Sequence, residues 1–464
     1  MPDADVNEGR FGAAKRASLV QELRQARSKR AGPERPATAR PAPPPRATAK
    51  AFDFSSLSGH KQLRLQRSAA DMLGIDVPYF REQQGYAGAT CSIDGREVLN
   101  FSSYNYLGLN GHPRVREAAK AAIDRYGVSV SASRVVAGER DLHARLEESL
   151  ARFYGTESAV CLVSGHATNV TTIGTLMGPK DLILVDGFIH NSITEGAKLS
   201  GATRVVFPHN DHAWVDDFLA RNRDRYERVL IAVEGLYSMD GDWPDLPKFV
   251  EVKQRRDAWL LVDEAHALGV LGETGRGLGE QMGVPADAVE IWMGTLSKTL
   301  SACGGYIAGS AALIELLKAT APGFVFSVGL AAPLAAAAHA ALEVMQEEPE
   351  RVAKLQANGR RIVAQAKAAE LDVGFAQGSA VMPVIVGDSA RAAMLADRVL
   401  RNGLNAMPIT FPAVPEKQAR LRFFLTSDHE DAQIDRAVEI TAEALQGIRS
   451  GALPFGASGG GAAG

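Results

Sequence analysis

Four short apolar runs in the middle of the chain constrain its fold more than any other feature. Each run ends at a turn or a polar cluster, and roughly 15 to 40 residues with helical patterns separate one run from the next. Continuous apolar runs of this length are typical of strands buried on both faces of a parallel sheet, with helices as the connections. The sequence therefore predicts an α/β fold with a mostly parallel central sheet and helices on both of its faces. The runs are "AVCLVSG", "DLILVDG", "RVLIAVEG" and "WLLVDEAH".

The pattern changes after about residue 345, where a charged helical stretch precedes two further strand candidates, "AVMPVIVG" and "ARLRFFLTS". We interpret this part as a smaller α+β domain. The alanine-rich stretch from Leu330 to Met345 is predicted to be a buried helix, because Pro333 and His339 interrupt it as a membrane span. The predicted organisation is a basic arm (1–50), an N-terminal segment (51–105), a large α/β domain (106–345), the α+β domain (346–450) and a flexible tail (451–464).

Cysteine usage and the N-terminus suggest a cytoplasmic protein. Cys91, Cys161 and Cys303 lie far apart and form no C-x-x-C pair, which indicates neither a disulfide framework nor a structural zinc site. No apolar run reaches the roughly 18 to 20 residues of a membrane span. The first ten residues lack the apolar core of a secretory signal.

Charge is concentrated at the N-terminus. Residues 1–50 hold 11 Lys/Arg against 5 Asp/Glu, whereas the whole chain has a net charge of −3. The proline-rich half of this arm cannot bury enough apolar surface to offset the entropy of ordering. Ala13 to Arg30 can form a helix suited to an acidic acyl carrier protein or to a peripheral contact with an anionic membrane; the alternative is a solvated tail.

Two motifs resemble sites of other protein classes. "DEAH" at Asp263–His266 also occurs in helicases, but the chain has no G-x-x-x-x-G-K-[ST] loop to hold nucleotide phosphates. His209 and His212, in "HNDH", lack a third ligand at a useful spacing, so we interpret them as part of a surface turn. We therefore predict neither a nucleic-acid partner nor a metal site.

Polar residues follow the predicted strands, at the sheet edge where ligands of open α/β sheets bind. One lysine, Lys298, stands among small and hydroxyl side chains in "GTLSKTLSACGG". A lysine in such a pocket can form a Schiff base with a carbonyl cofactor, and Asp263 can keep a pyridine nitrogen protonated. The combination predicts pyridoxal 5'-phosphate. Taken singly, Lys298 could be a surface lysine and Asp263 a strand-end cap.

Over about residues 60 to 448 the chain resembles the α-oxoamine synthases, pyridoxal-phosphate enzymes of fold type I. The similarity implies a transferase that joins an amino acid to an acyl thioester with loss of carbon dioxide. Within this family, "YNYLG" and "FPAVP" are most similar to the serine palmitoyltransferase branch. The matching stretches are "FSSYNYLGL", "SGHATN", "HNS", "EGLYSMDGD", "VDEAHALGVLGETGRG" and "MGTLSKTLSACGGYIAG".

The resemblance implies roles around the cofactor ring. Lys298 would form the Schiff base and later remove the Cα proton of the amino acid, and Asp263 would pair with the ring nitrogen. His190 would stack on the ring and could orient the substrate carboxylate. His266 and Ser238 would hydrogen-bond the ring hydroxyl.

A second group of residues would hold the phosphate, namely Gly165, His166 and Thr295. The family usually has Phe or Tyr in place of His166, so only its backbone role is carried over. The family also often has a Thr-Ser pair where this chain has Val328 and Gly329.

The amino-acid carboxylate would bind to Arg422, with Arg420 as the second candidate and Asn105 assisting. Tyr104, His190 or the cofactor phosphate could bind a serine hydroxyl. The resemblance thus implies a homodimer that condenses L-serine with a long-chain acyl thioester to a 3-oxosphinganine-like ketone, as in sphingolipid biosynthesis.

Three alternatives remain open. An 8-amino-7-oxononanoate synthase would use alanine and a pimeloyl thioester, but that branch carries an arginine in an "RPP" segment where this chain has Thr410-Phe411-Pro412. A polyketide-associated synthase would take the acyl group from a carrier protein instead of coenzyme A. A non-catalytic regulatory subunit is disfavoured because Lys298 and Asp263 are both present.

Overall fold

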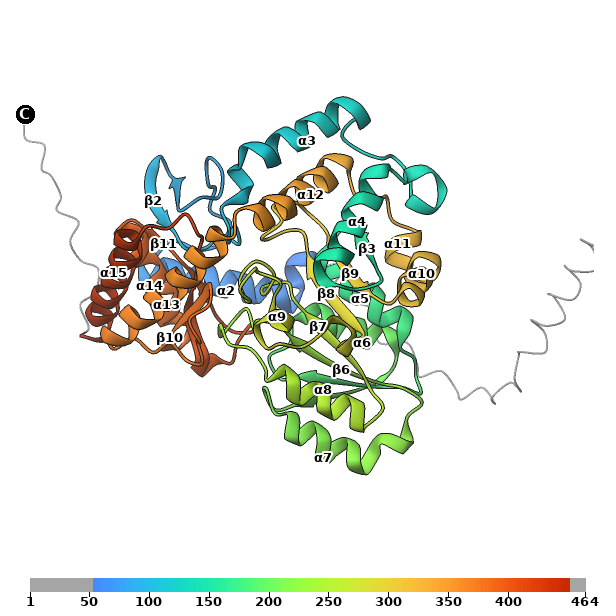
Figure 1. Ribbon diagram of the computed structural model, residues 1–464. Coiled ribbons are helices and arrows are strands. Elements are labelled where there is room, and N and C mark those ends of the chain that lie inside the picture. Colours follow the sequence, from blue (N-terminus) through green and yellow to red (C-terminus); the bar gives the residue numbers. More distant parts are fainter. Residues whose placement is uncertain (1–52, 451–464) are drawn as a thin grey trace, which may run out of the picture. The chain divides into compact units, whose positions relative to one another are not determined.

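A computed structural model describes residues 53–450 (Figure 1). Its contacts divide the chain into two compact units, and the boundary along the sequence falls between Ala69 and Ala70. In the first unit, Asp53 caps the short helix η2 (Phe54–Ser56) by accepting the backbone N–H of Ser55 at 2.9 Å. Helix α2 (Ser58–Leu73) begins in this unit. The predictions for the basic arm, its helix and the C-terminal tail lie outside the described residues.

The second unit contains a seven-stranded sheet with the strand order β3-β9-β8-β7-β6-β4-β5. All four predicted apolar runs are strands of this sheet. Neighbouring strands are parallel except at β9, which is antiparallel to both β3 and β8. The prediction of a mostly parallel sheet is confirmed. The strands are β3 (Ser158–Leu162), β4 (Leu182–Asp186), β5 (Thr203–Phe207), β6 (Val229–Glu234), β7 (Trp259–Asp263), β8 (Ile291–Thr295) and β9 (Gly305–Gly309).

Side chains of the central strands alternate between two apolar clusters, one on each face of the sheet. In β7, Leu261 belongs to one cluster and Leu260 and Val262 belong to the other. Each such side chain contributes about 1.5–3 kcal/mol by leaving water. One face packs on α5 (Gly165–Leu176), α6 (Asn191–Ser200), α10 (Ala311–Thr320) and α11 (Pro322–Val325); the other packs on α4 (Asp141–Tyr154), α7 (His212–Asn222), α8 (Leu246–Arg255) and α12 (Ala332–Glu347).

Helix α12 corresponds to the predicted buried helix, and its alanines let neighbouring elements approach closely. Ten of its side chains are buried, and α3 (Pro113–Tyr126) runs beside it (Figure 1). Between residues 53 and 450, no helix is long and apolar enough to cross a membrane.

The C-terminal part has its own antiparallel sheet in the order β10-β13-β12, together with three long helices. A third sheet joins distant parts of the sequence, because β2 pairs in parallel with β11. The elements are β1 (Thr90–Ile93), β2 (Arg96–Asn100), β10 (Val381–Gly387), β11 (Leu404–Asn405), β12 (Met407–Ile409), β13 (Ala419–Phe424), α13 (Glu350–Ala368), α14 (Ser389–Arg401) and α15 (Asp431–Arg449).

Candidate active site

The carboxyl ends of the parallel strands meet at one edge of the central sheet, and the loops that leave them form a cavity of about 230 Å³. Eight residues singled out from the sequence line it together, although they come from segments up to about 200 residues apart. These are Tyr104, Gly165, His166, His190, Asp263, His266, Thr295 and Lys298; the other lining residues are Ser164, Asn169, Ser192, Glu234, Ala265, Met293 and Ser297.

Lys298 follows β8 and occupies the wall of this cavity. Burial lowers the pKa of its amine to about 8, although the nearby carboxyls of Asp263 and Glu234 favour the charged form. The amine lies 5.6 Å from the centre of the Tyr104 ring. A lowered pKa leaves a useful fraction of the amine neutral near pH 7, which a Schiff-base nucleophile requires.

Asp263 ends β7 and is almost fully buried. Its two carboxylate oxygens accept N–H groups from the side chain of Asn169 at 2.8 Å and from the backbone of Ala265 at 3.0 Å. Glu234 is its register partner on β6. Burial and the nearby carboxyl of Asp263 raise the pKa of Glu234 well above its usual value, so the Glu234 carboxyl is neutral near pH 7.

His190 caps the first turn of α6. Its Nδ1 accepts the backbone N–H of Ser192 at 3.3 Å and lies 2.7 Å from the Ser192 hydroxyl oxygen, which leaves Nε2 free to carry the proton. The His166 ring stands edge-on to it, with centroids 6.3 Å apart.

His266 is held from two sides. The Tyr106 hydroxyl lies 2.6 Å from its Nδ1, and the Phe424 ring stacks on the imidazole at 6.0 Å. Burial lowers the pKa of His266 well below its usual value and raises the pKa of Tyr106 well above its own. Both groups are therefore neutral, and Nε2 of His266 remains available at the cavity.

The N-terminus of α5 provides an anion site opposite these groups. Ser164 caps the helix by accepting the backbone N–H of Ala167 at 3.4 Å, so the N–H groups of Gly165 and His166 remain for a ligand. A Cβ atom on Gly165 would lie only 2.8 Å from Oγ1 of Thr295. The close approach of backbone and hydroxyl fits a phosphate cradle.

Together, the nucleophilic amine, the buried carboxylate and the helix N-terminus match the carbonyl, pyridine nitrogen and phosphate of pyridoxal 5'-phosphate. The donor set therefore fits this cofactor.

Arg422, on β13, is buried beside the cavity but does not line it. Its Nη1 donates to the backbone carbonyl of Ser238 at 3.2 Å, and the guanidinium lies over the Phe424 ring at 4.4 Å. Its Nε is buried and has no hydrogen-bond partner among the described residues. An unpaired buried donor is costly, and a substrate carboxylate would satisfy it. Ser238 itself contributes its backbone here and is not part of the cavity lining.

Arg420 and Asn105 are engaged elsewhere. Arg420 pairs with Asp240 at 2.6 Å and donates to the Met239 carbonyl at 2.9 Å. The Asn105 amide donates to the Ala87 carbonyl at 2.7 Å, and its oxygen accepts the backbone N–H of Asn110. These bonds use groups that the two side chains would need in order to bind a substrate.

Sequence reasoning did not select three residues that shape the site: Asn169, Ser192 and Tyr106. Asn169 and Ser192 lie inside motifs that were recognised, "SGHATN" and "HNS", one helical turn or less from a selected residue. Their role becomes visible only when the Asn169 amide is seen to bond both Asp263 and the Ser192 hydroxyl, the latter at 2.9 Å.

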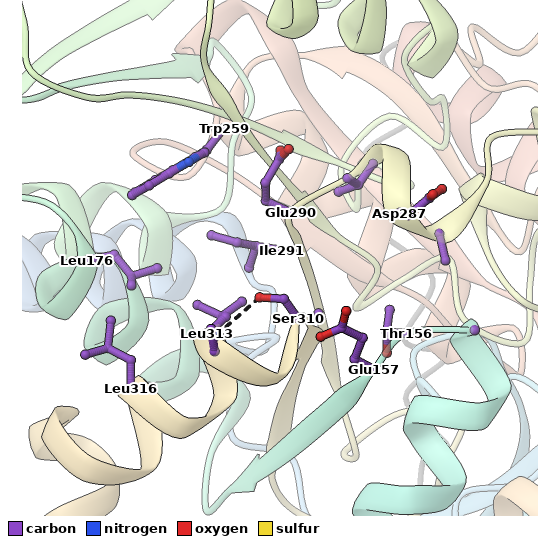
Figure 2. A pocket seen from close by; sticks show the side chains of 15 residues that line it. Thr156, Glu157, Leu176, Trp259, Asp287, Glu290, Ile291, Ser310, Leu313 and Leu316 are labelled. Carbon is purple, nitrogen blue, oxygen red and sulfur yellow. Dashed lines mark hydrogen bonds between the residues drawn. The ribbon is translucent and has the colours of Figure 1, made fainter.

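A larger cavity, of about 460 Å³, lies at the amino ends of β7 and β8 (Figure 2) and contains none of the selected residues. Two of its three acidic side chains, those of Glu157 and Glu290, have protein partners; the third is that of Asp287. Glu157 accepts the backbone N–H of Ala311 at 2.8 Å, and Glu290 accepts the Lys253 ammonium at 2.5 Å. The smaller cavity, with its convergent polar groups, is therefore the candidate active site.

Comparison with known proteins agrees with this site. Residues 96–440 match the family described as aminotransferase class I and II, so the chain belongs to this family of pyridoxal-phosphate enzymes. More particularly, it is an acyltransferase of the α-oxoamine synthase family, as its relatives show.

The 8-amino-7-oxononanoate synthase of Geobacter sulfurreducens is 42% identical over 78% of this chain and 92% of its own. The solved structure of Sphingomonas wittichii serine palmitoyltransferase has a TM-score of 0.81 and 32% identity, covering 87% of this chain and all of the other. For 8-amino-7-oxononanoate synthase from Francisella tularensis the TM-score is 0.65 and the identity 26%, with 76% and 99% covered. The predicted family, fold and cofactor are confirmed, together with the general reaction of an amino acid with an acyl thioester.

Proposed function

We propose that this enzyme condenses L-alanine with a pimeloyl thioester, as an 8-amino-7-oxononanoate synthase. The observation that carries the proposal is the 42% identity to a synthase of that name over 92% of the relative's length. The serine palmitoyltransferase of S. wittichii is 32% identical. The comparisons therefore favour alanine over the serine expected from "YNYLG" and "FPAVP".

We assign the central proton transfer to Lys298. Its lowered pKa lets the neutral amine remove the Cα proton of the bound amino acid near pH 8. Pyridoxal 5'-phosphate supplies an electron sink when it is bound, and Asp263 would keep its ring nitrogen protonated. His190 would stack on the ring through the orientation that Ser192 imposes. His266 would donate its Nε2–H to the ring hydroxyl, which the Tyr106 contact favours.

Phosphate binding would use the N–H groups of Gly165 and His166 and the hydroxyl of Thr295. For the substrate carboxylate we assign Arg422, because its unpaired Nε needs an acceptor. Arg420, neutralised by Asp240, is the weaker candidate.

Alanine also suits the polar groups of the site. A serine hydroxyl needs a hydrogen-bond partner, and a site built around such a partner discriminates strongly against alanine. Asn105 already uses its amide group and its oxygen in bonds to the backbone, and Nε2 of His266 is assigned to the ring hydroxyl of the cofactor, so neither would serve as that partner. The methyl group of alanine makes no such demand.

Serine with a long-chain acyl thioester is the second candidate. The S. wittichii structure superposes with a TM-score of 0.81, against 0.65 for the F. tularensis synthase. In addition, Thr410 stands in a segment where the biotin branch carries an arginine. The carboxylate at the far end of a pimeloyl chain would gain from such a cation, whereas a plain alkyl chain would not.

A homodimer is supported by exposed apolar side chains on two neighbouring loops. Val128, Val135 and Val136 are 57–82% exposed, and Phe326 is 85% exposed. The two loops are joined by the Ser133 hydroxyl, which donates to the Val325 carbonyl at 2.7 Å. Clustered apolar surface of this kind marks an interface, and we propose that a second copy covers it.

The test is a matrix of substrates with the purified holoenzyme. Alanine, serine and glycine are each incubated with pimeloyl and palmitoyl thioesters, both as coenzyme A and as carrier-protein conjugates, and the products are identified by mass spectrometry. The proposal expects the highest kcat/KM for alanine with a pimeloyl donor. A preference for serine with the palmitoyl donor would establish the second candidate and refute the first.

A further inference from the structure

His209 lies in a turn, as the sequence suggested, but its side chain points away from solvent. It follows β5, and its side chain is only 13% exposed. Its two ring nitrogens bond to two different carboxylates: Nδ1 lies 2.8 Å from Asp186 Oδ1, and Nε2 lies 2.9 Å from Asp242 Oδ2. The turn was predicted correctly, but the burial of the ring was not, because the chain places three segments around it.

The two bonds determine the charge of the imidazole. Carboxylates only accept hydrogen bonds, so both ring nitrogens must donate, which requires the protonated imidazolium. Burial alone would lower the pKa of His209, but the hydrogen bonds to Asp186 and Asp242 outweigh burial and raise the pKa to about 9. His209 is therefore a buried cation near neutral pH.

Aromatic side chains close the remaining sides of the ring. Phe188 stacks on it with centroids 4.2 Å apart, and Tyr237 meets it edge-on at 4.5 Å. Phe375, from the C-terminal part, lies at 6.0 Å. Burial raises the pKa of Tyr237 well above its usual value, so its hydroxyl is neutral. The acidic side chains that face His209 directly are Asp186 and Asp242. Asp240, which pairs with Arg420, lies near Asp242 and His209.

Each carboxylate belongs to a loop of the candidate active site. Asp186 ends β4 four residues before His190, and its Oδ1 also accepts the backbone N–H of Phe188 at 2.8 Å. Asp242 closes the loop after β6, where its backbone carbonyl accepts the N–H of Tyr237 at 2.8 Å. That loop contains Ser238, whose carbonyl holds Arg422.

We propose that His209 is a positioning residue, whose imidazolium clamps the His190 loop to the loop that holds Arg422. It touches neither substrate nor cofactor, and it acts through Asp186 and Asp242. This inference rests on the proposed roles of His190 and Arg422 in the α-oxoamine synthase reaction, but it does not depend on which amino acid is used.

The test compares His209→Gln with His212→Gln, a matched change at the next histidine of the same motif. Cofactor content, cofactor dissociation constant, and kcat and KM per bound cofactor are measured with the preferred amino acid. We expect His209→Gln to lower kcat/KM at least tenfold per bound cofactor and to weaken cofactor binding severalfold, with His212→Gln within twofold of wild type. Adding Asp242→Asn to His209→Gln should restore part of both losses, because one of the two unneutralised carboxylates is removed.

A purely structural role predicts a different pattern, in which His209→Gln lowers thermal stability but leaves kcat and KM per bound cofactor within twofold. That result would overturn the proposal, as would a double variant no better than the single one. A wrong substrate assignment would instead appear as low activity of the wild type itself.

If His209→Gln does not fold, Asp242→Asn alone provides the test. Removing one carboxylate should lower the pKa of His209, because a nearby negative charge favours the protonated imidazole. The alkaline loss of kcat/KM should therefore begin at least 0.5 pH unit lower than in wild type. An unchanged alkaline limb would refute the role of the charge.

Discussion

Replacing His209 with glutamine should destabilise the protein by an amount that depends on pH. The folded protein raises the pKa of this imidazole from 6.5 to about 9 because two carboxylates accept its protons. A raised pKa stabilises the folded state fully below the unfolded value of 6.5, and the contribution disappears as the pH rises through 9. At roughly 1.4 kcal/mol per pKa unit, the charge contributes about 3 kcal/mol at pH 6, about 2 kcal/mol at pH 7.5 and about 0.2 kcal/mol at pH 9.5.

The assay is chemical denaturation of the wild type, His209→Gln and His212→Gln at these three pH values, followed by intrinsic fluorescence. The difference in unfolding free energy between wild type and His209→Gln should shrink by about 3 kcal/mol from pH 6 to pH 9.5. His212→Gln controls for general effects of pH on this region. Loss of packing would lower stability equally at all three pH values. A difference in unfolding free energy that is independent of pH would therefore refute the argument that the charge of His209 stabilises the folded protein.

Further expectations concern the active site directly. Lys298→Ala should abolish the yellow colour and the borohydride-reducible cofactor linkage, whereas Lys180→Ala should change neither; an adduct on another lysine would contradict the assignment. Asp263→Asn should fold but lose at least roughly 10² in rate, and near-wild-type turnover would remove it from the mechanism. Arg422→Lys should raise the KM for the amino acid about tenfold with little change in cofactor affinity, and the exposed Arg391→Lys serves as its control; an unchanged KM would exclude Arg422 from carboxylate binding.

Much of the fold was predictable because its signals are local. The continuous apolar runs that form β3, β4, β6 and β7 reflect burial on both faces of a sheet. Such burial requires apolar side chains at consecutive positions, which can be recognised in the sequence. The order of the strands was not readable, since it depends on which crossovers place β9 between β3 and β8. Likewise, no local sequence pattern predicts that β2 pairs with β11, which lies about 300 residues later in the chain.

The residues of the candidate site likewise fall into those that could be predicted from the sequence and those that could not. Lys298 and Asp263 could be selected from sequence because their chemistry is unusual for their surroundings and because the motifs around them resemble a family. The partners that tune them could not be selected, since Asn169, Ser192 and Tyr106 act through contacts between segments that are distant along the chain.

The sequence by itself thus determined the α/β class, the cofactor chemistry and most of the residues that line the cavity, because these follow from local apolar patterns and residue types. Only the tertiary structure decided which polar groups are free to act. In the folded chain, Arg420 and Asn105 are engaged in hydrogen bonds within the protein, whereas Nε of Arg422 has no partner among the described residues. It also turned His209 into a buried cation, because the charge of an imidazole depends on the carboxylates that the fold brings to it, and those lie 23 and 33 residues away in the chain.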